Sequence, residues 1–391
     1  MPNSKSSNFK NFVATKPAKK KIAIIGSYAG SLISFRGNLL VDLQKNHYEV
    51  IVLLPDINKH PTVASRLDCM GIKFFGFPLK GNRINPFSDI KSLICISRIL
   101  KRESVSALLL YTIKPVIYGS IVGRLLGIRK IFSIITGVGF VFTGKDSVKG
   151  RIVKFIVKTL YKFAFLFNKA IFFQNKDDLN LFIDLKLINR QNTLLTNGSG
   201  VDLDYYAPES VVSKVTNFLF IGRLLGDKGI REFIIAAAEV KAINPNVTFS
   251  VCGWIDHSPD AITQNELDAW ITQGVINYLG KMEDVRPAIA ESSVMVLPSY
   301  REGTPRSVLE AMSMGKPIIT CDVPGCRETV IDGINGYLVP HKSPKSLVLA
   351  MEKFISNPKD ILDMGYNSRL IASEKFNVID VNKIILNAIE T

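Results

Sequence analysis

Short apolar runs alternate with longer amphipathic stretches along most of the chain. Residues 22–25 are uniformly apolar, and a helical pattern of apolar positions follows through about residue 44. The same order of strand, glycine-containing loop and helix returns at residues 217–241. Strands that alternate with helices in this way are typical of parallel sheets built from βαβ units. The pattern therefore predicts an α/β protein with two Rossmann-like domains that face each other across a cleft.

Glycine, proline and small polar residues separate these segments and set their expected limits. Further strands are predicted at residues 47–54, 69–77, 106–111, 131–135, 170–175, 247–252, 275–279, 294–298 and 317–320. Further helices are predicted at residues 87–102, 149–169, 305–314, 346–356, 361–376 and 381–389. Loops are expected at residues 112–120 and 136–140, each directly after a predicted strand of the first domain.

A chain of 391 residues is long enough for two cores of ordinary size. No run of 18 apolar residues lacks a charge, so no transmembrane helix is predicted. The first 20 residues hold no apolar segment of a secretory signal, so we expect the body of the protein in the cytoplasm. The expected units are a disordered basic leader at 1–20, a first domain at 21–196, a linker at 197–213, a second domain at 214–372 and a last helix at 373–391.

The formal net charge of +15 indicates an anionic partner, which could be a nucleic acid, a nucleotide-linked substrate or a membrane surface. No zinc-finger or RNA-binding signature is present, so nucleic acid is the least favoured of the three. The 5 cysteines and 4 histidines show neither a disulfide framework nor metal-ligand spacing. We therefore expect no bound metal or cofactor.

The segment at residues 299–340 carries the strongest chemical signal. Thr304 suits a helix N-cap and Pro305 the first helical position, which predicts a helix start between two carboxylates, Glu302 and Glu310. A helix N-terminus attracts anions. A ligand with hydroxyls at both ends and a diphosphate in the middle fits this arrangement, and a nucleotide sugar is such a ligand. The alternative is a pair of solvated glutamates beside an ordinary capped helix.

Cations follow the first strand of each domain. In the second domain, Arg223 and Lys228 bracket a loop of the right size to bind two phosphates, with Gly222 at its start. In the first domain, Gly30 lies in the equivalent loop and Arg36 on the helix after it. Arg36 is either a phosphate clamp or an exposed helix cation. The loop lacks a full G-x-G-x-x-G, so a dehydrogenase is not favoured.

Two more loops of the first domain fall where open α/β sheets bind ligands. They contribute Lys114, Gly137 and Gly139 as candidates for the acceptor or phosphate side of the site. Asp202 and Asp204 spell D-x-D in the linker, where a polar turn is favoured over a metal site.

The pattern at residues 149–169 predicts a basic amphipathic helix, with Lys154, Lys158 and Lys162 on one stripe. Its aromatic residues include Phe155 and Phe163. Such a helix can lie in a membrane interface, or it can bury its apolar face on the sheet with solvated lysines. We favour partial burial combined with contact to an anionic membrane surface.

The segment from Glu302 to Glu310 resembles the E-x7-E element of retaining GT-B glycosyltransferases of family four. The resemblance extends through Gly303, Pro305 and the Gly315-Lys316-Pro317 that follows. It implies that Glu302 contacts the donor sugar and Glu310 the ribose. It also implies that Arg223 and Lys228 bind the diphosphate, that Met282 lies near the base, and that Glu302, Arg223 and Lys228 are the catalytic residues. The full set that it implies for donor binding is Gly222, Arg223, Lys228, Gly280, Met282, Glu302, Gly303, Thr304, Pro305 and Glu310.

The loops at residues 112–120 and 136–140 resemble the branch that extends undecaprenyl-diphosphate-linked intermediates, including N-acetylgalactosaminyltransferases. Other branches carry a histidine in the second loop, and this chain has none there, so no first-domain histidine is assigned a catalytic role. The resemblance implies a last helix that crosses back to the first domain, and transfer with retention and without a metal.

We therefore expect a retaining glycosyltransferase that moves a sugar, such as an N-acetylhexosamine, from a nucleotide sugar such as a UDP-sugar to a polyprenyl-diphosphate-linked saccharide. The expected location is the inner face of the plasma membrane, as a peripheral protein. Two alternatives stay open, a sugar-nucleotide epimerase of the same fold and a non-catalytic membrane protein that binds nucleotide sugars.

Overall fold

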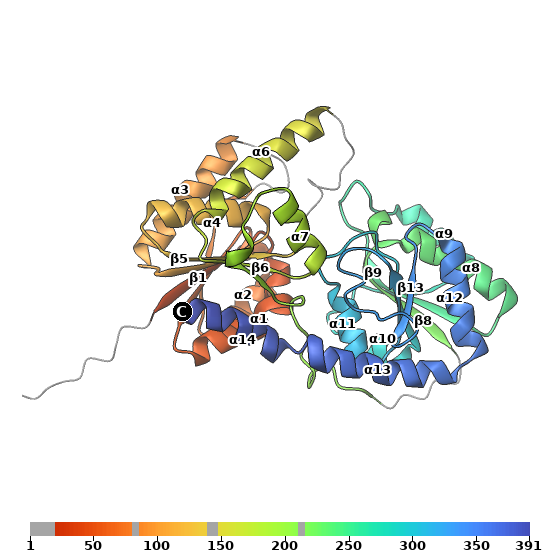
Figure 1. The fold of residues 1–391 in the computed structure, drawn as a ribbon. Helices are drawn as coiled ribbons and strands as arrows, with labels where there is room; N and C mark the ends of the chain where they lie inside the picture. Colours follow the sequence, from red (N-terminus) through yellow and green to blue (C-terminus); the bar gives the residue numbers. More distant parts are fainter. Residues whose placement is uncertain (1–19, 80–85, 139–147, 210–215) are drawn as a thin grey trace, which may run out of the picture.

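The structure is a computed structural model, and it describes residues 20–79, 86–138, 148–209 and 216–391. The expected leader, apart from residue 20, and the candidate Gly139 lie outside the described residues. The described chain forms two α/β units, each with its own parallel sheet (Figure 1).

The first sheet contains seven parallel strands in the order β3-β2-β1-β4-β5-β6-β7. These strands are β1 (Lys21–Ile25), β2 (Glu49–Leu54), β3 (Lys73–Gly76), β4 (Ala107–Tyr111), β5 (Lys130–Ile135), β6 (Ala170–Phe173) and β7 (Thr193–Leu195). The strand order reverses between β1 and β4. In doubly wound sheets, ligands bind outside the carboxyl ends of the strands at this switch point.

Both faces of the first sheet are covered, because successive side chains of each strand point to opposite sides. Ile22 and Ile24 of β1 belong to one core, and Ala23 and Ile25 belong to the other. Helices α1 (Leu32–Lys45) and α2 (Pro61–Cys69) cover the first of these faces, and α3 (Pro86–Arg102), α4 (Ile113–Leu125), α6 (Val148–Phe165) and α7 (Lys176–Asp184) cover the second.

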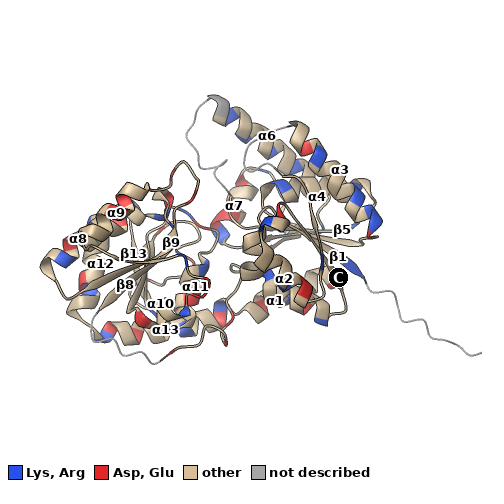
Figure 2. Cartoon of the chain, turned by 180° about the vertical axis from the view of Figure 1, so that it is seen from behind, with Lys and Arg blue, Asp and Glu red and all other residues tan. Residues whose placement is uncertain are grey.

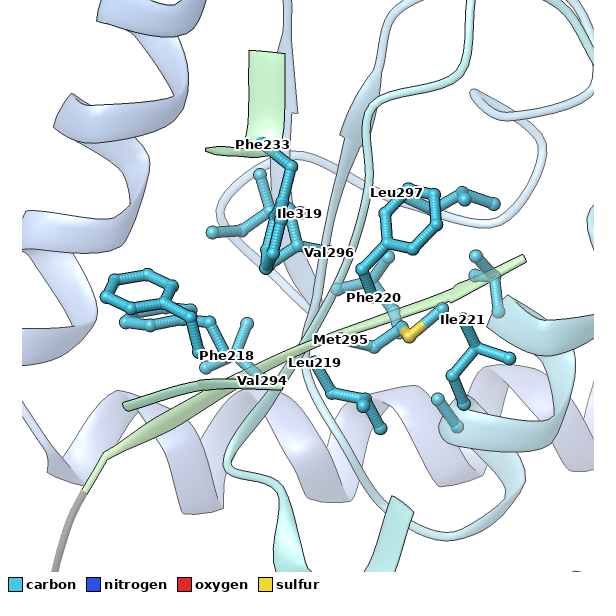
Figure 3. Packing of buried hydrophobic residues seen from close by; sticks show 14 of the residues in the cluster. Phe218, Leu219, Phe220, Ile221, Phe233, Val294, Met295, Val296, Leu297 and Ile319 are labelled. Carbon is cyan, nitrogen blue, oxygen red and sulfur yellow. The ribbon is translucent and has the colours of Figure 1, made fainter. Parts of the chain in front are cut away.

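The second sheet contains six parallel strands in the order β10-β9-β8-β11-β12-β13. The strands are β8 (Asn217–Arg223), β9 (Thr248–Trp254), β10 (Asn277–Gly280), β11 (Val294–Leu297), β12 (Ile318–Cys321) and β13 (Gly336–Val339). The helices are α8 (Ile230–Ile243), α9 (Gln264–Thr272), α10 (Arg286–Glu291), α11 (Arg306–Ser313), α12 (Pro344–Ser356) and α13 (Lys359–Lys375). Figure 3 shows the buried side chains of β8 and β11 packed together with Phe233 of α8. The predicted pair of Rossmann-like parallel sheets is confirmed.

The last helix, α14 (Val378–Glu390), packs on α1 of the first domain, as predicted (Figure 1). Its Ile385 and Ile389 are fully buried in the first-domain core. Asn382 Nδ2 donates a hydrogen bond to Asp42 Oδ2 at 2.7 Å, and Lys130 Nζ donates to the Ile389 carbonyl at 3.0 Å. The helix therefore completes a core that is otherwise made from the first part of the chain.

The chain passes between the two units at two places that lie side by side. Val201 N–H donates to the Phe376 carbonyl at 2.8 Å, and Val378 N–H donates to the Val201 carbonyl at 3.0 Å. Gly200 has φ +72, and a Cβ there would lie 2.6 Å from the Cα of Val378. Only glycine allows the two crossing segments to approach this closely.

Two predicted segments differ from the structure. Residues 69–72 were expected in the third strand, but Cys69 ends α2 and β3 begins at Lys73. The reason is Gly71, whose φ of +65 gives the left-handed conformation that follows many helices. The expected loop after β4 is instead the start of α4, where Pro115 fits because the first turn of a helix needs no N–H from it.

Candidate active site

Glu302 lies in the loop between β11 and α11, at the carboxyl edge of the second sheet. Its Oε1 accepts hydrogen bonds from Lys228 Nζ at 2.5 Å and from Ser299 Oγ at 2.8 Å. The Lys228 and Glu302 side chains are only 17% and 14% exposed. The structure therefore brings together the carboxylate and the lysine that the sequence placed 74 residues apart.

A glycine lets these two loops approach each other. Lys228 ends the short helix η4 (Gly226–Lys228), and Gly229 follows with φ +73. A Cβ at Gly229 would lie 2.2 Å from the carbonyl oxygen of Pro298, which ends the β11 segment. Any side chain at this position would separate Lys228 from Glu302.

Thr304 does not cap helix α11, which corrects the expected helix start. Pro305 occupies the N-cap position, and the helix begins at Arg306. The Thr304 hydroxyl instead donates a hydrogen bond to the Gln174 carbonyl of the first domain at 3.1 Å. Gly303 is equally close to that domain, because a Cβ there would lie 2.4 Å from the Thr136 carbonyl oxygen. These two residues therefore lie at the contact between the domains.

Glu310 is buried on α11, with 8% of its surface exposed. Its Oε1 accepts a hydrogen bond from Arg306 Nε at 2.8 Å, one helical turn earlier. The Arg306 guanidinium also lies 5.5 Å from the centre of the Phe35 ring on α1. Burial and the charge of Glu310 together raise the pKa of Tyr206. The second glutamate is thus held rigidly, next to the first domain.

Arg223 ends β8, and its side chain is 46% exposed. Its Nη1 donates to Asp256 Oδ2 at 2.7 Å. Partial burial acts to raise the pKa of Asp256, but the hydrogen bond and charge of Arg223 lower it below the usual value. Gly222 lies against Gly253 of the neighbouring strand, where a Cβ on Gly253 would be 2.0 Å from the Gly222 carbonyl oxygen.

The neighbouring strand ends carry the candidates for the base. Gly280 ends β10 with φ +71, and Met282 packs partly buried against the second core. Lys281 Nζ lies 5.1 Å from the centre of the Trp254 ring, which is at the end of β9. These residues therefore lie on two adjacent strand ends of the second sheet.

Arg36 is not an exposed helix cation. It is 3% exposed on α1, and burial lowers its pKa to about 10, against the attraction of the buried Tyr111. Among the described residues, neither Arg36 Nε nor the Tyr111 hydroxyl has a hydrogen-bond partner. The nearby Arg306 adds a further positive charge. A charged arginine buried in this way is costly unless a counter-charge or an acceptor lies within its reach.

A cavity of about 380 Å³ lies at the carboxyl ends of β4 and β5. Its lining includes two of the predicted acceptor-side residues, Lys114 and Gly137. Lys114 Nζ pairs with Asp89 of α3 at 3.0 Å, and Gly137 has φ +130. The rest of the lining is Ser27, Tyr28, Leu79, Thr112, Ile113, Ile134, Ile135, Thr136 and Tyr161.

Two other candidates, one in the first domain and one in the linker, have local explanations. Gly30 lies in the short helix η1 (Ala29–Ser31), where a Cβ would be 2.7 Å from the Tyr28 hydroxyl. Asp202 Oδ1 accepts the N–H groups of Asp204 and Tyr205 at 3.2 and 3.0 Å, which is the predicted polar turn. Among the described residues, no group of three or more His, Cys, Asp or Glu could hold a metal ion.

Helix α6 buries one face and exposes another. Val157, Tyr161 and Phe165 lie in the first-domain core, whereas Phe155 and Phe163 are 71% and 49% exposed. Lys162 is exposed, and Lys154 and Lys158 are partly exposed. Figure 2 shows blue lysine and arginine positions along this helix and along α3. No described helix is long and apolar enough to span a bilayer.

Several residues of the site were not singled out from the sequence. Ser299 and Arg306 bind the two glutamates, and Arg306 could have been found from its spacing of four residues to Glu310. Asn175 and Asp178 of the first domain bind the segment around Glu302. Only the N-cap pattern Asn175-x-x-Asp178 is visible in the sequence, and it does not reveal the contact to the other domain.

Comparison with known families identifies the class of protein. Residues 215–357 match the family described as glycosyl transferases group 1, and residues 21–175 match the family described as glycosyl transferase 4-like. Together with the fold, these matches show that the chain is a glycosyltransferase with the GT-B fold. Its first domain is of the glycosyl transferase 4-like type, and its second domain is of group 1.

The chain is 25% identical over 362 residues to the N,N'-diacetylbacillosaminyl-diphospho-undecaprenol alpha-1,3-N-acetylgalactosaminyltransferase of Campylobacter jejuni, covering 89% of this chain and 93% of that one. It is 27% identical over 328 residues to the UDP-Gal:alpha-D-GlcNAc-diphosphoundecaprenol alpha-1,3-galactosyltransferase of Escherichia coli, covering 80% and 82%. The predicted resemblance to this branch is confirmed.

Solved structures agree with the fold. A glycosyltransferase from Rickettsia africae superposes with a TM-score of 0.77 at 17% identity, covering 95% of this chain and 98% of that one. Anabaena HepE in complex with UDP and glucose gives a TM-score of 0.76 at 18% identity, covering 95% and 100%.

Proposed function

We propose that this enzyme transfers a sugar, with retention of the anomeric configuration, from a nucleotide sugar to a polyprenyl-diphosphate-linked saccharide. The observation that carries the proposal is the largely buried cluster of Glu302, Lys228 and Ser299 at the carboxyl edge of the second sheet, beside the first domain. The names of the Campylobacter and Escherichia relatives, both of which act on diphospho-undecaprenol-linked sugars, support the choice of acceptor.

The second domain binds the donor in this proposal. Arg223 and Lys228 bind the diphosphate, and Lys228 can do so without leaving Glu302 because an ammonium group has three donors. Glu302 contacts the sugar and Glu310 the ribose. The remaining contacts come from Gly222, from Gly303, Thr304 and Pro305 near the start of α11, and from Gly280 and Met282 at the base.

In the reaction, the bond between the anomeric carbon and the leaving phosphate oxygen breaks while the acceptor oxygen attacks from the same face. The acceptor's proton passes to that phosphate oxygen, so no protein nucleophile is needed. The negative charge that develops on the diphosphate is stabilised by Arg223 and Lys228, whose side chains are already positioned by Asp256 and Glu302.

The acceptor occupies the first domain in this proposal. The cavity of about 380 Å³ combines apolar residues of β5 and α6 with Lys114 and Thr112, which suits a lipid-linked diphosphate. Arg36, Gly30 and Gly137 belong to the same side of the site in this proposal. Because the buried Arg36 Nε donates no hydrogen bond to any described residue, a phosphate group within its reach would relieve the cost of its burial.

The membrane surface of the protein is proposed to be α6 and the adjoining helices. Lys154, Lys158 and Lys162 would lie among anionic headgroups of the inner leaflet, with Phe155 and Phe163 inserted. Helix α3 lies on the same face of the sheet beyond α4 (Figures 1 and 2), and it exposes Phe87, Ile90 and Ile94. The apolar surface is therefore wider than α6 alone.

The test is mass spectrometry of a lipid-linked saccharide incubated with the enzyme and a panel of UDP- and GDP-sugars. A mass increase of one sugar that requires both substrates is expected, and it should be absent in the Glu302→Gln variant. Conversion of a nucleotide sugar into its epimer without any acceptor would contradict the proposal. Binding of nucleotide sugars with no turnover on any acceptor would contradict it as well.

A further inference from the structure

Helix α7 of the first domain begins directly beside the segment that carries Glu302. Its N-cap residue Asn175 accepts the Asp178 N–H at 2.7 Å and donates from Nδ2 to the Gly303 carbonyl at 2.5 Å. Asp178, in the first turn, pairs through Oδ1 with Nη2 of Arg301. One helix end of the first domain therefore binds the residues on both sides of Glu302.

The Glu302 side chain, in contrast, is held by its own domain. Lys228 and Ser299, both in the second domain, donate to its carboxylate. The Glu302 N–H also stays within that domain, because it donates to the Pro324 carbonyl at 3.1 Å. The position of the carboxylate thus depends on contacts with both domains at once.

The contact of Asp178 with Arg301 is buried on the Asp178 side. Asp178 is 0% exposed, and burial raises the pKa of its carboxyl group although the charge of Arg301 acts to lower it. Removal of one partner from a buried ion pair leaves the other charge uncompensated, which is costly. The ion pair between Asp178 and Arg301 therefore forms only while the two domains are in contact.

The neighbouring residue Asp177 offers a natural comparison. It pairs with Arg327 of the second domain at 3.3 Å, and both side chains are at least 32% exposed. Arg327 also binds Asp322 at 2.7 Å, so it has a partner without Asp177. This pair joins the same two domains but does not touch the Glu302 segment.

We propose that Asp178 is a positioning residue, which binds Arg301 and so fixes the Glu302 carboxylate against the donor only when the two domains are together. The inference rests on the proposed function for its catalytic consequence. Asn175 acts with it by holding the Gly303 carbonyl. Donor binding through Arg223, Lys228 and Glu310 does not depend on this contact.

The kinetic test compares Asp178→Asn with the matched control Asp177→Asn. Because displacement of a catalytic group by about 1 Å can cost about 100-fold in rate, Asp178→Asn should lower kcat by about 10- to 100-fold. Its affinity for UDP, used as the probe in calorimetry, should stay within about twofold, and Asp177→Asn should change neither quantity. An equal effect of both variants on kcat would overturn the proposal.

A second test needs no turnover, so it separates this inference from the proposed function. Hydrogen–deuterium exchange at residues 299–304 should become faster in Asp178→Asn and in Arg301→Gln, but not in Asp177→Asn. The double variant Asp178→Asn/Arg301→Gln should be no worse than the more affected single variant, because the two residues act as one unit. Unchanged exchange in the single variants, or fully additive effects in the double variant, would refute the coupling. If exchange responds as expected but no donor is turned over by the unmodified enzyme, the failure lies in the proposed function.

Discussion

Replacement of Lys228 by alanine is the most direct test of the donor site. At the observed 2.5 Å, and with an effective dielectric constant of about 20, the attraction between Lys228 and Glu302 is about 7 kcal/mol before desolvation is subtracted. Most of that attraction is offset by the cost of burying both charges. The pair therefore contributes more to the geometry of the site than to the stability of the fold.

The catalytic effect of the replacement should be larger. A single positioned donor to a developing negative charge contributes about 2.7–4 kcal/mol, which is about 10²- to 10³-fold in kcat. Lys228→Ala removes such a donor and also releases the Glu302 carboxylate, so kcat should fall by at least this factor. The measurement is the initial rate of saccharide extension followed by mass spectrometry, with the unfolding temperature recorded in parallel.

Lys241→Ala is the matched control, because Lys241 lies at the far end of the helix that follows Lys228 and binds only the Gly274 carbonyl among the described residues. It should leave kcat unchanged. A Lys228→Ala enzyme with normal kcat and a raised donor KM would mean that the lysine binds ground state and transition state equally. Normal kcat and normal KM together would refute the assignment of Lys228.

Four further outcomes are expected. Glu302→Gln should lower kcat more than donor affinity, whereas Glu310→Ala should mainly raise the donor KM; identical effects would remove the division of roles. Full activity is expected in EDTA, and a loss that magnesium or manganese restores would point back to Asp202 and Asp204. Replacement of Lys154, Lys158 and Lys162 by glutamate should abolish sedimentation with anionic vesicles, because each lysine contributes about 1 kcal/mol at such a surface. If the variant still sediments with the vesicles, the membrane contact lies on another part of the protein. Burial lowers the pKa of Arg36 from its usual value to about 10, so the cost of its buried charge is fully present below pH 10 and is relieved as the pH rises above 10. Arg36→Met should therefore raise the unfolding free energy at pH 7, measured in urea, by about 1–3 kcal/mol while it weakens transfer. A lower stability of this variant would refute the reasoning.

Local sequence signals were enough for the fold and for part of the site. The alternation of apolar strands and amphipathic helices predicted both sheets apart from their edge strands β7 and β13, and Pro305 and Gly315 placed α11 to within one residue at each end. A known family pattern singled out Lys228 and Glu302 as donor-site residues, but their direct contact is visible only in the structure. These features depend on short-range geometry that repeats in every βαβ unit.

The contacts between the domains could not be predicted in the same way. Thr304 has the residue type of an N-cap, but its hydroxyl binds Gln174, which lies 130 positions away. The sequence left open whether Arg36 is an exposed helix cation, and the structure buries it near Arg306. Which group such a side chain contacts depends on how the two domains pack against each other. A single sequence carries no periodic signal for that packing.

Helix α14 has a consequence for how this protein is made. Its buried Ile385 and Ile389 belong to the core of the domain that leaves the ribosome first. That core stays open on the α1 side until residues 378–390 have been synthesised, so the first domain cannot reach its final stability while the second is being translated. The nascent first domain therefore keeps apolar surface exposed until the last helix has been synthesised. Termination between the end of α13 and the start of α14 would leave the second domain complete and the first one unfinished, which is the kind of product that chaperones and proteases recognise.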